Sequence, residues 1–493
     1  MNMQRRRFWF WAGMALAAGL VLRLWFIKHM AVIAGDSLVY GDIAQNWLQH
    51  GVYGFTETVP GTGMVIRPTL IRLPGYPMFL AVCFRLFGVN NYHAVLYVQA
   101  AIDLLTCWLA SALAGRLFGN RAAMVVLWLA AICPFTANYV AAALTETLTL
   151  CSIALAFYSF ARWQNAGSRF NRWIWVVAVA LSWSLLLRPE QSVFAVGVLT
   201  AMLWRSLATR ECRSRPLRSA WPVLTAALCV ILPLVPWTVR NWRTFHVFQP
   251  LAPHYANDPG ELAPLGFSCW YRTWAIDFKS TQEVYWNYSG DRIELADLPS
   301  RAFDAGSPQE SQSLRDRTAA LLVDYNATTR VTADVTPAID ARFAALAAER
   351  IHAHPMLYYV GLPSARLLDM VLRPRAELMN IPLDWWRWKE YRGRTTFSFA
   401  YAGVNFAYMV LGFLGFYIWW RSDWDVSGSG QITCRELALA MTASLILRAA
   451  VLLAIDNSEP RYTLEFFPVL FVWAGALLAT PMRLASVDQP GKR

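Results

Sequence analysis

Two carboxylates follow directly on the first hydrophobic segment of this chain. They are Asp36 and Asp42, in the run GDSLVYGD that begins at Gly35. A carboxylate at the rim of an apolar segment can take a proton from a hydroxyl group, which makes it a candidate general base. Asp36 is the stronger candidate of the two, because it opens a new structural element.

The stretch that begins at Asp36 has the pattern of a helix. Its apolar residues recur at i, i+3, i+4, i+7 and i+8, namely Tyr40, Ile43, Ala44, Trp47 and Leu48. One apolar face of this kind suits a helix that lies in the membrane interface. Asp36 could therefore be the N-cap of this helix, and the capping and catalytic interpretations are compatible. Asp42 falls on the solvated side of the same helix, where we expect a bystander.

An arginine and a second acid extend this chemistry. Arg72 stands before the rigid turn LPGYP, and its five donors suit a phosphate group, although snorkelling to lipid headgroups is the alternative. Glu146 lies inside an apolar stretch, where an acid is rare and favours a functional role over a plain contact between helices. Arg188 and Glu190 flank a proline in a tight turn, where they could also pair with each other.

Five other polar residues complete the candidate set. Most of them lie near the end of an apolar segment, and all lie on the side that the basic residues of the short loops indicate to be the outside; they are Arg67, Arg240, Asn241, Arg461 and Tyr462. Ionisable groups at membrane depth are costly and usually line a pathway or a site. Several such groups on one side of a membrane predict a single cavity at that face.

The composition places these residues in a membrane protein. Of the 493 residues, 56% are apolar and only 15% are charged, unlike an ordinary soluble domain. Apolar runs that approach the length of a membrane span occur at residues 8–27, 92–115, 121–137, 141–161, 173–187, 191–207, 220–238, 398–420, 435–455 and 464–482. The sequence therefore predicts an all-α polytopic membrane protein with about ten transmembrane helices. The first run contains Arg23 and is followed by no cleavage site, so we expect a retained anchor.

Arginines in the short loops indicate the orientation of these spans. If the N-terminus is cytoplasmic, six inner segments carry basic residues, including Arg5–Arg7, Arg116, Arg121, Arg162, Arg205, Arg421 and Arg435. The short outer loops carry almost none. Both termini are then cytoplasmic, and the candidate residues face the outside. The net charge of +12 is explained by these loops, so no nucleic-acid partner is expected.

The lengths of the outer segments divide the chain into three parts. Residues 1–238 form an N-terminal transmembrane module with a long first outer loop, residues 28–91. Residues 239–397 are polar enough and long enough to form an extracytoplasmic loop domain. Residues 398–493 supply the C-terminal transmembrane helices, with a polar linker near 421–431.

Prolines mark two helices in the loop domain. One helix is predicted to begin at Pro308 and run toward Asp324, and another to begin at Pro337 and end before His354. The apolar run 356–371 contains charged residues, so we expect it to lie at the interface and not to span the membrane.

The sequence indicates no metal site and requires no cofactor. The eight cysteines form no CxxC pair, and the histidines have no metal-ligand spacing apart from the weak pair His352 and His354. A divalent metal is left open but has no support in the sequence.

Six short motifs in order resemble a known family. They are GDSLVYGDIAQNWLQHGVYGF from Gly35, RLPGYPMFLA from Arg72, ALTETLT from Ala143, LLRPE ending at Glu190, PWTVRNW from Pro236 and EPRYTLEFFP from Glu459. Together they are similar to the GT-C polyprenyl-phosphate-sugar glycosyltransferases, including glycosyltransferase family 39, the protein mannosyltransferases and the aminoarabinose transferases. The resemblance covers residues 1 to about 250 and the last two spans.

The resemblance implies a GT-C fold and roles for particular residues. Asp36 occupies the catalytic position of the first outer loop, Glu146 matches a second acid, and Arg72 matches a basic residue near the donor phosphate. Ser37 departs from the Asp-Glu pair of many protein mannosyltransferases, which weakens the case for a protein acceptor and for a metal. The further spans and the C-terminal domain of the aminoarabinose transferases are not matched, so a lipid A acceptor is not implied.

The predicted function is sugar transfer at the outer face of a membrane. The donor would be an undecaprenyl- or dolichyl-phosphate sugar, and the acceptor a hydroxyl group of a glycan, a lipid or a protein. One direct attack would invert the anomeric centre, and the remaining candidate residues would contact the donor or its phosphate. The bacterial inner membrane is the expected location. The alternatives are a lipid-linked sugar flippase or transporter and a non-catalytic assembly factor.

Overall fold

The computed structural model describes residues 3–59, 61, 63–166, 168, 170–207, 216–288, 290–332, 335–421 and 435–478. Nearly all of its regular structure is helical, which confirms the all-α prediction. The chain divides into two compact units. The first unit contains residues 1–253, 404–448 and 464–493, and the second contains residues 254–403 and 449–463.

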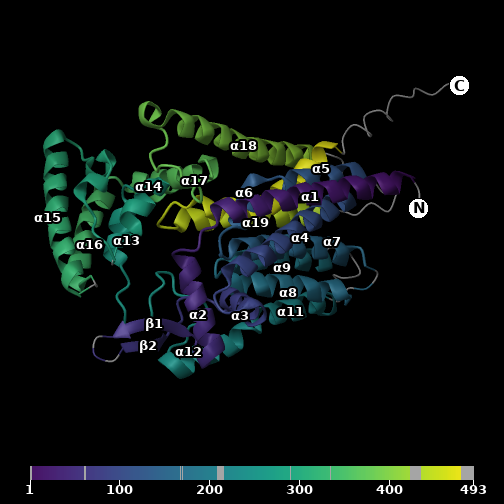
Figure 1. The fold of residues 1–493 in the computed structure, drawn as a ribbon, viewed down its shortest axis with the longest axis horizontal. Helices are drawn as coiled ribbons and strands as arrows, with labels where there is room; N and C mark the ends of the chain where they lie inside the picture. Colours follow the sequence, from purple (N-terminus) through teal and green to yellow (C-terminus); the bar gives the residue numbers. More distant parts are fainter. Residues whose placement is uncertain are drawn as a thin grey trace. The chain divides into compact units, whose positions relative to one another are not determined.

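The first unit contains most of the apolar helices and a single hairpin (Figure 1). In chain order its elements are α1 (Met3–Met30), α2 (Asp36–His50), β1 (Gly54–Val59), β2 (Gly63–Pro68), α3 (Gly75–Phe87), α4 (Tyr92–Phe118), α5 (Asn120–Ala131), α6 (Pro134–Tyr139), α7 (Glu146–Gln164), α8 (Arg172–Leu187), α9 (Gln191–Leu207), α11 (Pro216–Ile231), α12 (Leu234–Phe245), α19 (Arg435–Ala454) and α20 (Phe467–Gly475). The long helix α18 (Trp388–Arg421) begins in the second unit and ends in the first, and the last turn of α19, from residue 449, belongs to the second unit.

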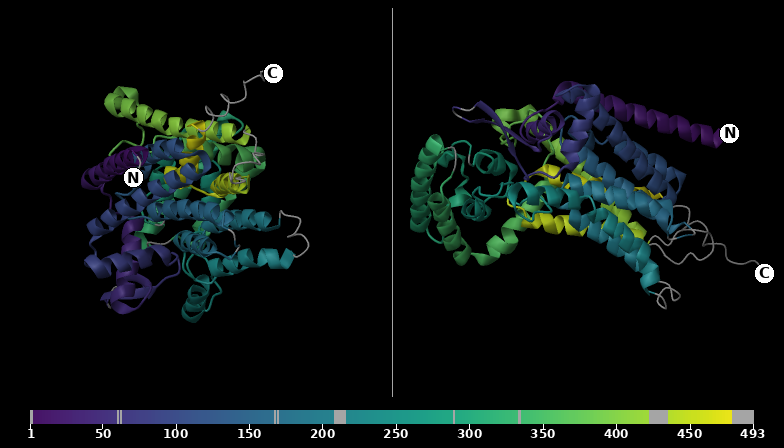
Figure 2. Two further views of the ribbon diagram at one scale, coloured as in Figure 1. Left: turned by 90° about the vertical axis from the view of Figure 1, so that its right-hand side faces the viewer. Right: turned by 90° about the horizontal axis from the view of Figure 1, so that it is seen from below.

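The helices of the first unit pack side by side. Helix α4 contacts α5 and α7, α7 contacts α8, and α8 contacts α9 and α11. Figures 1 and 2 show α4, α7, α8 and α11 running alongside one another in every view. Helix α1 packs on α4 and α5, and α20 also packs on α4 and α5. Helix α20, near the end of the described chain, is therefore part of the same bundle as the N-terminal helices.

Local sequence signals set the ends of these helices. The Asn91 side chain accepts a hydrogen bond from the backbone N–H of Ala94 and caps α4. Asn171 does the same for α8, through the N–H of Trp173. Helix α4 ends at Phe118, and the cap residue Gly119 has a φ of 93°, which favours glycine. These boundaries fix where the polar residues between the helices emerge.

Six helices in the described part of the chain are long and apolar enough to cross a membrane. They are Arg6–Met30, Tyr92–Phe118, Pro216–Phe245, Trp388–Arg421, Arg435–Ala454 and Pro460–Leu478. Shorter apolar helices occur at Gly75–Phe87, Asn120–Ala131, Arg172–Leu187 and Gln191–Leu207. The protein is an integral membrane protein, and the predicted number of ten spans stays a prediction. The predicted span 141–161 begins later than expected, because α7 starts at Glu146.

The second unit is a helical domain with an aromatic core. Its helices are α13 (Leu265–Arg272), α14 (Phe278–Ser280), α15 (Pro308–Thr332), α16 (Pro337–Ala353) and α17 (Leu362–Leu372). Buried aromatic residues from three of these helices make up much of the core, among them Phe267, Trp270, Tyr325 and Phe343. The placement of this unit outside the cell stays a prediction.

Two predicted helix starts in the second unit are confirmed. Helix α15 begins at Pro308, and α16 begins at Pro337 and ends at Ala353. The Thr336 side chain caps α16 by accepting from the N–H of Ile339. The run 356–371 forms a π-helical turn followed by α17, and it is not among the helices long and apolar enough to span. The predicted linker near 421–431 lies, apart from Arg421, outside the described residues.

Candidate functional site

Asp36 is the first residue of α2, and its side chain is paired. The predicted N-cap role is wrong: Gly35 occupies the cap position with a φ of 52°, which glycine adopts without strain. The carboxylate of Asp36 instead accepts a hydrogen bond from Nη2 of Arg72 at 2.8 Å. A carboxylate in the first helical turn is favoured by the helix dipole. Asp36 and Arg72, both candidates from the sequence, are therefore in direct contact.

Aromatic residues hold this pair in place. The Arg72 guanidinium lies 5.8 Å from the centre of the Tyr40 ring, and the Tyr53 hydroxyl donates to the Arg72 carbonyl at 2.9 Å. Burial, opposed by the charge of Arg72, raises the pKa of Tyr40 to about 12. The phenol therefore stays protonated near neutral pH, which leaves Asp36 as the base of this group. The pair is about a quarter exposed, with 25% for Arg72 and 30% for Asp36.

The turn after Arg72 packs tightly on the end of α8. A side chain at Gly75 would meet the Leu186 carbonyl at 2.6 Å, so only glycine fits there. Helix α8 ends at Leu187, and Arg188 follows at once. This close approach brings the turn that carries Arg72 next to the turn that carries Arg188.

A second set of contacts ties the loop before Asp36 to the loop before Glu146. The Val32 N–H donates to the Ala141 carbonyl at 3.0 Å. From the other side, the buried Gln99 amide donates to the Ala142 carbonyl at 2.8 Å, and Gln99 itself accepts from the Tyr76 hydroxyl at 2.8 Å. The segments that precede Asp36 and Glu146 are therefore joined by a hydrogen bond.

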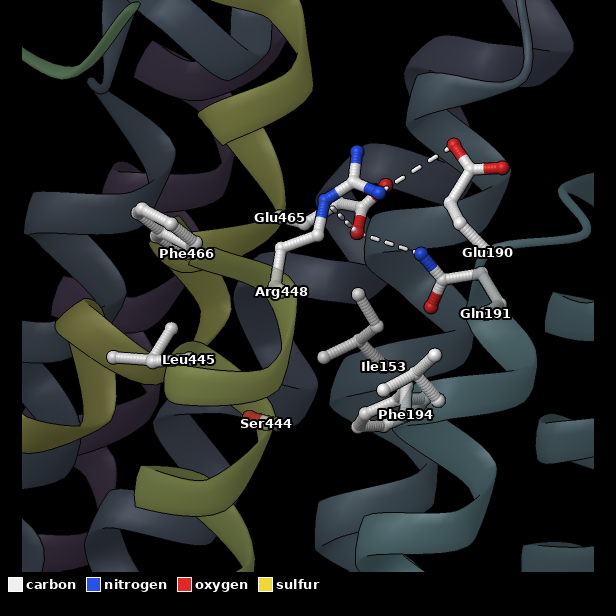
Figure 3. Close-up of a pocket in the computed structure, with 10 residues that line it drawn as sticks. Ile153, Glu190, Gln191, Phe194, Ser444, Leu445, Arg448, Glu465 and Phe466 are labelled. Carbon is white, nitrogen blue, oxygen red and sulfur yellow. Dashed lines mark hydrogen bonds and ion pairs between the residues drawn. The ribbon is translucent and has the colours of Figure 1, made fainter. Parts of the chain in front are cut away.

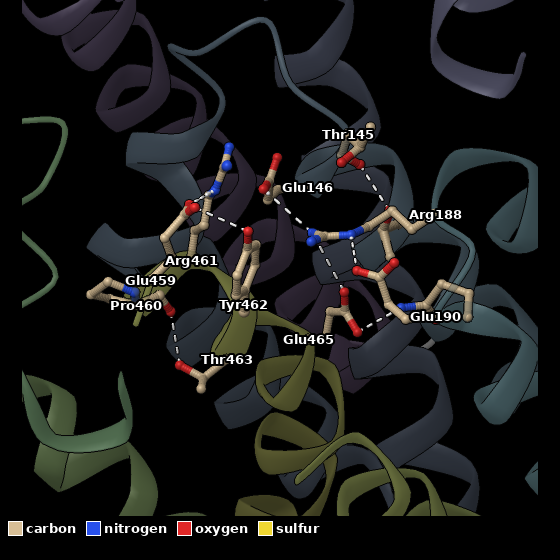
Figure 4. Close-up of polar contacts among 12 residues, drawn as sticks. Thr145, Glu146, Arg188, Glu190, Glu459, Pro460, Arg461, Tyr462, Thr463 and Glu465 are labelled. Carbon is tan, nitrogen blue, oxygen red and sulfur yellow. Dashed lines mark hydrogen bonds and ion pairs between the residues drawn. The ribbon is translucent and has the colours of Figure 1, made fainter. Parts of the chain in front are cut away.

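Glu146 begins α7 and belongs to a buried charged network (Figure 4). Nη1 of Arg188 lies 3.4 Å from Glu146 and 3.6 Å from Glu465. Nε of Arg188 donates to Glu190 at 2.8 Å, as the sequence allowed. Side-chain exposure is 3% for Glu146 and 10% for Arg188. One guanidinium therefore joins three carboxylates in a site that is almost dry.

Two members of this network, Arg448 and Glu465, were missed in the sequence analysis. Arg448 of α19 lies 3.4 Å from Glu190 and 3.0 Å from Glu465 (Figure 3). Arg448 and Glu465 line a cavity of about 20 Å³, which has room for about one water molecule. Both residues lie inside predicted spans, 435–455 and 464–482, and an ionisable residue at that depth was the signal that could have revealed them.

Acidification tests the contribution of Glu190 to this network. Burial would raise the pKa of Glu190, but Arg188 and Arg448 hold it at about 2, below its usual 4.5. A carboxyl group with a lowered pKa stabilises the fold above its unfolded pKa and loses that effect as the pH falls through the folded one. We expect Glu190→Gln to flatten the fall of the thermal midpoint between about pH 4.5 and 2, measured in detergent. Equal slopes for wild type and variant would contradict this.

Several other candidates have structural partners. Asp42 accepts hydrogen bonds from the Thr56 backbone at 2.7 Å and from its hydroxyl at 2.8 Å, so it anchors β1 on α2. Arg67 of β2 pairs with Glu57 of the opposite strand at 2.8 Å.

Arg240 and Asn241 also contact the protein backbone. Arg240 donates to the carbonyls of Tyr53 and Thr69, both at 2.6 Å, and it packs against three aromatic rings. The Asn241 amide donates to the Gln249 carbonyl at 2.8 Å. Arg240 therefore holds α12 against the first outer loop at Tyr53 and Thr69, and Asn241 ties the segment after α12 back to that helix.

Arg461 and Tyr462 belong to the second unit, in its segment 449–463. Both side chains contact Glu459, with the Tyr462 hydroxyl donating at 3.0 Å and Arg461 forming an ion pair (Figure 4). Asn457 adds a third donor at 2.9 Å. The EPRY motif is therefore a local cluster built around one buried carboxylate. A single cavity that joins all the candidates stays a prediction.

Among the described residues, no group of three or more His, Cys, Asp or Glu side chains is arranged to hold a metal ion. The six described cysteines are free thiols. What the site offers is a partly exposed carboxylate–guanidinium pair and a buried charged network, a set suited to proton transfer and to binding an anion.

Comparison with known proteins identifies a family for part of the chain. Residues 67–238 match the family described as dolichyl-phosphate-mannose-protein mannosyltransferase. The matched segment contains Arg72, Glu146, Arg188 and Glu190 and begins after Asp36. A search of curated proteins found no match.

Similar solved structures were also found. One is the oligosaccharyltransferase AglB of Archaeoglobus fulgidus in complex with an inhibitory peptide and a dolichol-phosphate, at 12% identity and a TM-score of 0.46, covering 97% of this chain and 50% of that one. Another is ArnT of Cupriavidus metallidurans bound to undecaprenyl phosphate, at 14% identity and a TM-score of 0.34, covering 95% and 77%. The chain spans about half the length of the archaeal protein. Because these TM-scores are low, an activity for this chain can be inferred only from the family match and the geometry of the site.

Proposed function

We propose that this protein is a GT-C glycosyltransferase, because its residues 67–238 match the family described as dolichyl-phosphate-mannose-protein mannosyltransferase. In this proposal it transfers a sugar from a polyprenyl-phosphate carrier to an acceptor hydroxyl. The reaction takes place at the extracytoplasmic face, in the inner membrane of a bacterium, with both termini in the cytoplasm. Arginines in the short loops of the opposite side support this orientation.

The contact between Asp36 and Arg72 is the observation that carries this proposal. A partly exposed guanidinium can exchange its carboxylate partner for the phosphate of an incoming donor, because it binds both groups with similar geometry. That exchange releases the carboxylate of Asp36 beside the bound donor. The same pair therefore provides an anion site and a base whose release depends on donor binding.

The chemical step follows from these two roles. Asp36 takes the proton of the acceptor hydroxyl as its oxygen bonds to the anomeric carbon of the sugar. The bond from that carbon to the phosphate oxygen breaks, and the polyprenyl phosphate leaves with the electron pair, stabilised by Arg72. A single displacement inverts the anomeric centre. Glu146, the first residue of α7, orients the acceptor.

Release of the carrier tests the proposed function. Purified protein in nanodiscs is given undecaprenyl-phosphate hexoses and pentoses and dolichyl-phosphate mannose, one at a time, with a membrane extract as the source of acceptor. We expect mass spectrometry to detect free polyprenyl phosphate with one of these donors, at a rate proportional to the amount of protein.

Two results would contradict the proposal. Movement of an intact carrier-linked sugar across the bilayer without its consumption would indicate a flippase. Binding of undecaprenyl phosphate without turnover of any donor in the panel would indicate an assembly factor. Boiled protein and Asp36→Asn protein serve as controls for release that does not depend on the site.

A further inference from the structure

Arg448 and Glu465 connect the C-terminal helices to the candidate site. We infer that these two residues are positioning residues for sugar transfer: they hold Arg188 in place and, through Arg188, fix the carboxylate of Glu146. This inference rests on the proposed function, because Glu146 has its role only in that reaction. It adds residues of α19 and of the segment before α20 to a site otherwise built from the first half of the chain.

The geometry of the contacts gives Arg448 and Arg188 the same two partners. Arg188 contacts Glu190 at 2.8 Å and Glu465 at 3.6 Å. Arg448 contacts Glu190 at 3.4 Å and Glu465 at 3.0 Å (Figure 3). The two carboxylates therefore lie between two guanidinium groups. Without Arg448, both carboxylates would move toward Arg188 and change its distance from Glu146.

A hydrogen-bonded amide fixes Glu465 further. Gln191, the first residue of α9, donates to Glu465 at 2.6 Å and accepts from the Ser184 hydroxyl of α8 at 3.1 Å. Glu465 is thus oriented by residues of three helices, α8, α9 and α19. The carboxylate of Glu465, which Arg188 contacts, is therefore held in one position.

Burial of the network favours a positioning role over a purely structural one. Side-chain exposure is 7% for Arg448, 6% for Glu465 and 3% for Glu146. Charged groups taken out of water are costly, and apolar residues of similar volume often stabilise a fold as well or better. This buried set of charges ends at Glu146, the first residue of α7. It is therefore better explained by holding the carboxylate of Glu146 in position than by stabilising the fold.

Kinetics of two variants test this inference. We expect Arg448→Gln and Glu465→Gln each to lower kcat by roughly 10–100-fold, since a small displacement of a positioned group has effects of this size. The KM for the donor and the binding of undecaprenyl phosphate to purified protein should stay within about twofold of wild type. Arg448→Lys, which keeps the charge, should restore part of the loss. If Arg448→Gln does not fold, the kinetics of Glu465→Gln alone test the inference. We expect that variant to fold, because Arg448 keeps Glu190 as its partner.

A double-mutant cycle separates positioning from general damage. In a Glu146→Gln background, Arg448→Gln should cause much less than its single-variant loss, because the group that it positions has already been changed. If the losses multiply, Arg448 acts independently of Glu146 and the inference is wrong.

A second ion pair between the same two helices provides the matched control. Arg205 of α9 lies 3.8 Å from Glu436 of α19, near the opposite ends of both helices from Glu190 and Arg448. We expect Arg205→Gln to leave kcat within about twofold of wild type, since the pair is partly exposed and remote. An equal loss of kcat in Arg205→Gln and Arg448→Gln would show that both pairs only hold the helices together, which overturns the inference.

Different results contradict the proposed function and the positioning roles. Wild-type protein that consumes no donor contradicts the proposed function whatever the variants do. Active wild-type protein with fully active Arg448→Gln and Glu465→Gln variants contradicts only the positioning roles.

Discussion

Asp36→Asn is expected to lower the rate of sugar transfer by about 10²–10⁴-fold, the range for loss of a general base. Asparagine has nearly the same shape as aspartate, but its amide cannot accept the proton of the acceptor hydroxyl. The amide oxygen can still accept from Nη2 of Arg72, which contacts Asp36 at 2.8 Å in the wild type, but without the charge of the carboxylate. The loss should appear in kcat at saturating donor, measured as release of polyprenyl phosphate.

The fold should tolerate this substitution. The Asp36–Arg72 pair is 30% and 25% exposed, and ion pairs of this kind contribute about 1 kcal/mol or less. We therefore expect a normal yield of folded protein and a thermal midpoint within a few degrees of the wild type. Binding of undecaprenyl phosphate should be kept or strengthened, since Arg72 no longer has a charged partner competing with the phosphate.

Asp42→Asn is the matched control for Asp36→Asn. Asp42 lies on the same helix, and its carboxylate accepts two hydrogen bonds from Thr56. Its substitution should loosen β1 and lower stability, because one of those acceptors is lost. Transfer by the protein that remains folded should stay close to the wild-type rate. Equal losses of transfer in the two variants, or near-normal transfer by Asp36→Asn, would show that Asp36 is not the base.

The sequence predicted the helices better than the contacts between them. Helix starts at Pro308 and Pro337 follow from local chemistry, because a proline needs no donor in the first turn. The cap at Asp36 was wrong for a local reason as well, since the left-handed conformation of Gly35 takes that position. Local rules fix helix ends only to within a residue or two, and one residue decides which side chain can cap.

Contacts between distant segments lay beyond the sequence patterns. The pair of Arg188 and Glu190 could be anticipated, because two residues in one turn lie close together. Their contacts with Arg448 and Glu465 join segments more than 250 positions apart and depend on how α9, α19 and α20 pack. Arg240 is another example. Its contact with the donor phosphate stays a prediction, and the sequence did not reveal that its guanidinium donates to two backbone carbonyls of the folded first loop.

Arg23→Leu is expected to destabilise the protein by about 3–5 kcal/mol, the cost of breaking a buried ion pair by removing one partner. Arg23 lies in the first apolar helix, where its charge alone would be unfavourable. Nε donates to Asp103 of α4 at 2.8 Å, and Nη1 donates to the carbonyls of Gly19 and Ala131, both at 2.8 Å. The exposure of the pair is 0% and 1%. The variant should show a much lower yield and a lower thermal midpoint in detergent.

The double variant Arg23→Leu with Asp103→Leu separates the two causes of that loss. In the single variant the carboxylate of Asp103 stays buried without its partner, which is the larger cost. In the double variant no charge is left there, and the remaining losses are the hydrogen bonds of Arg23 to the carbonyls of Gly19 and Ala131 and to the sulfur of Cys107. The double variant should therefore regain most of the thermal midpoint. If it is no more stable than Arg23→Leu, the carbonyl contacts carry the stability. If Arg23→Leu matches the wild type, this ion pair does not hold α1 in the bundle.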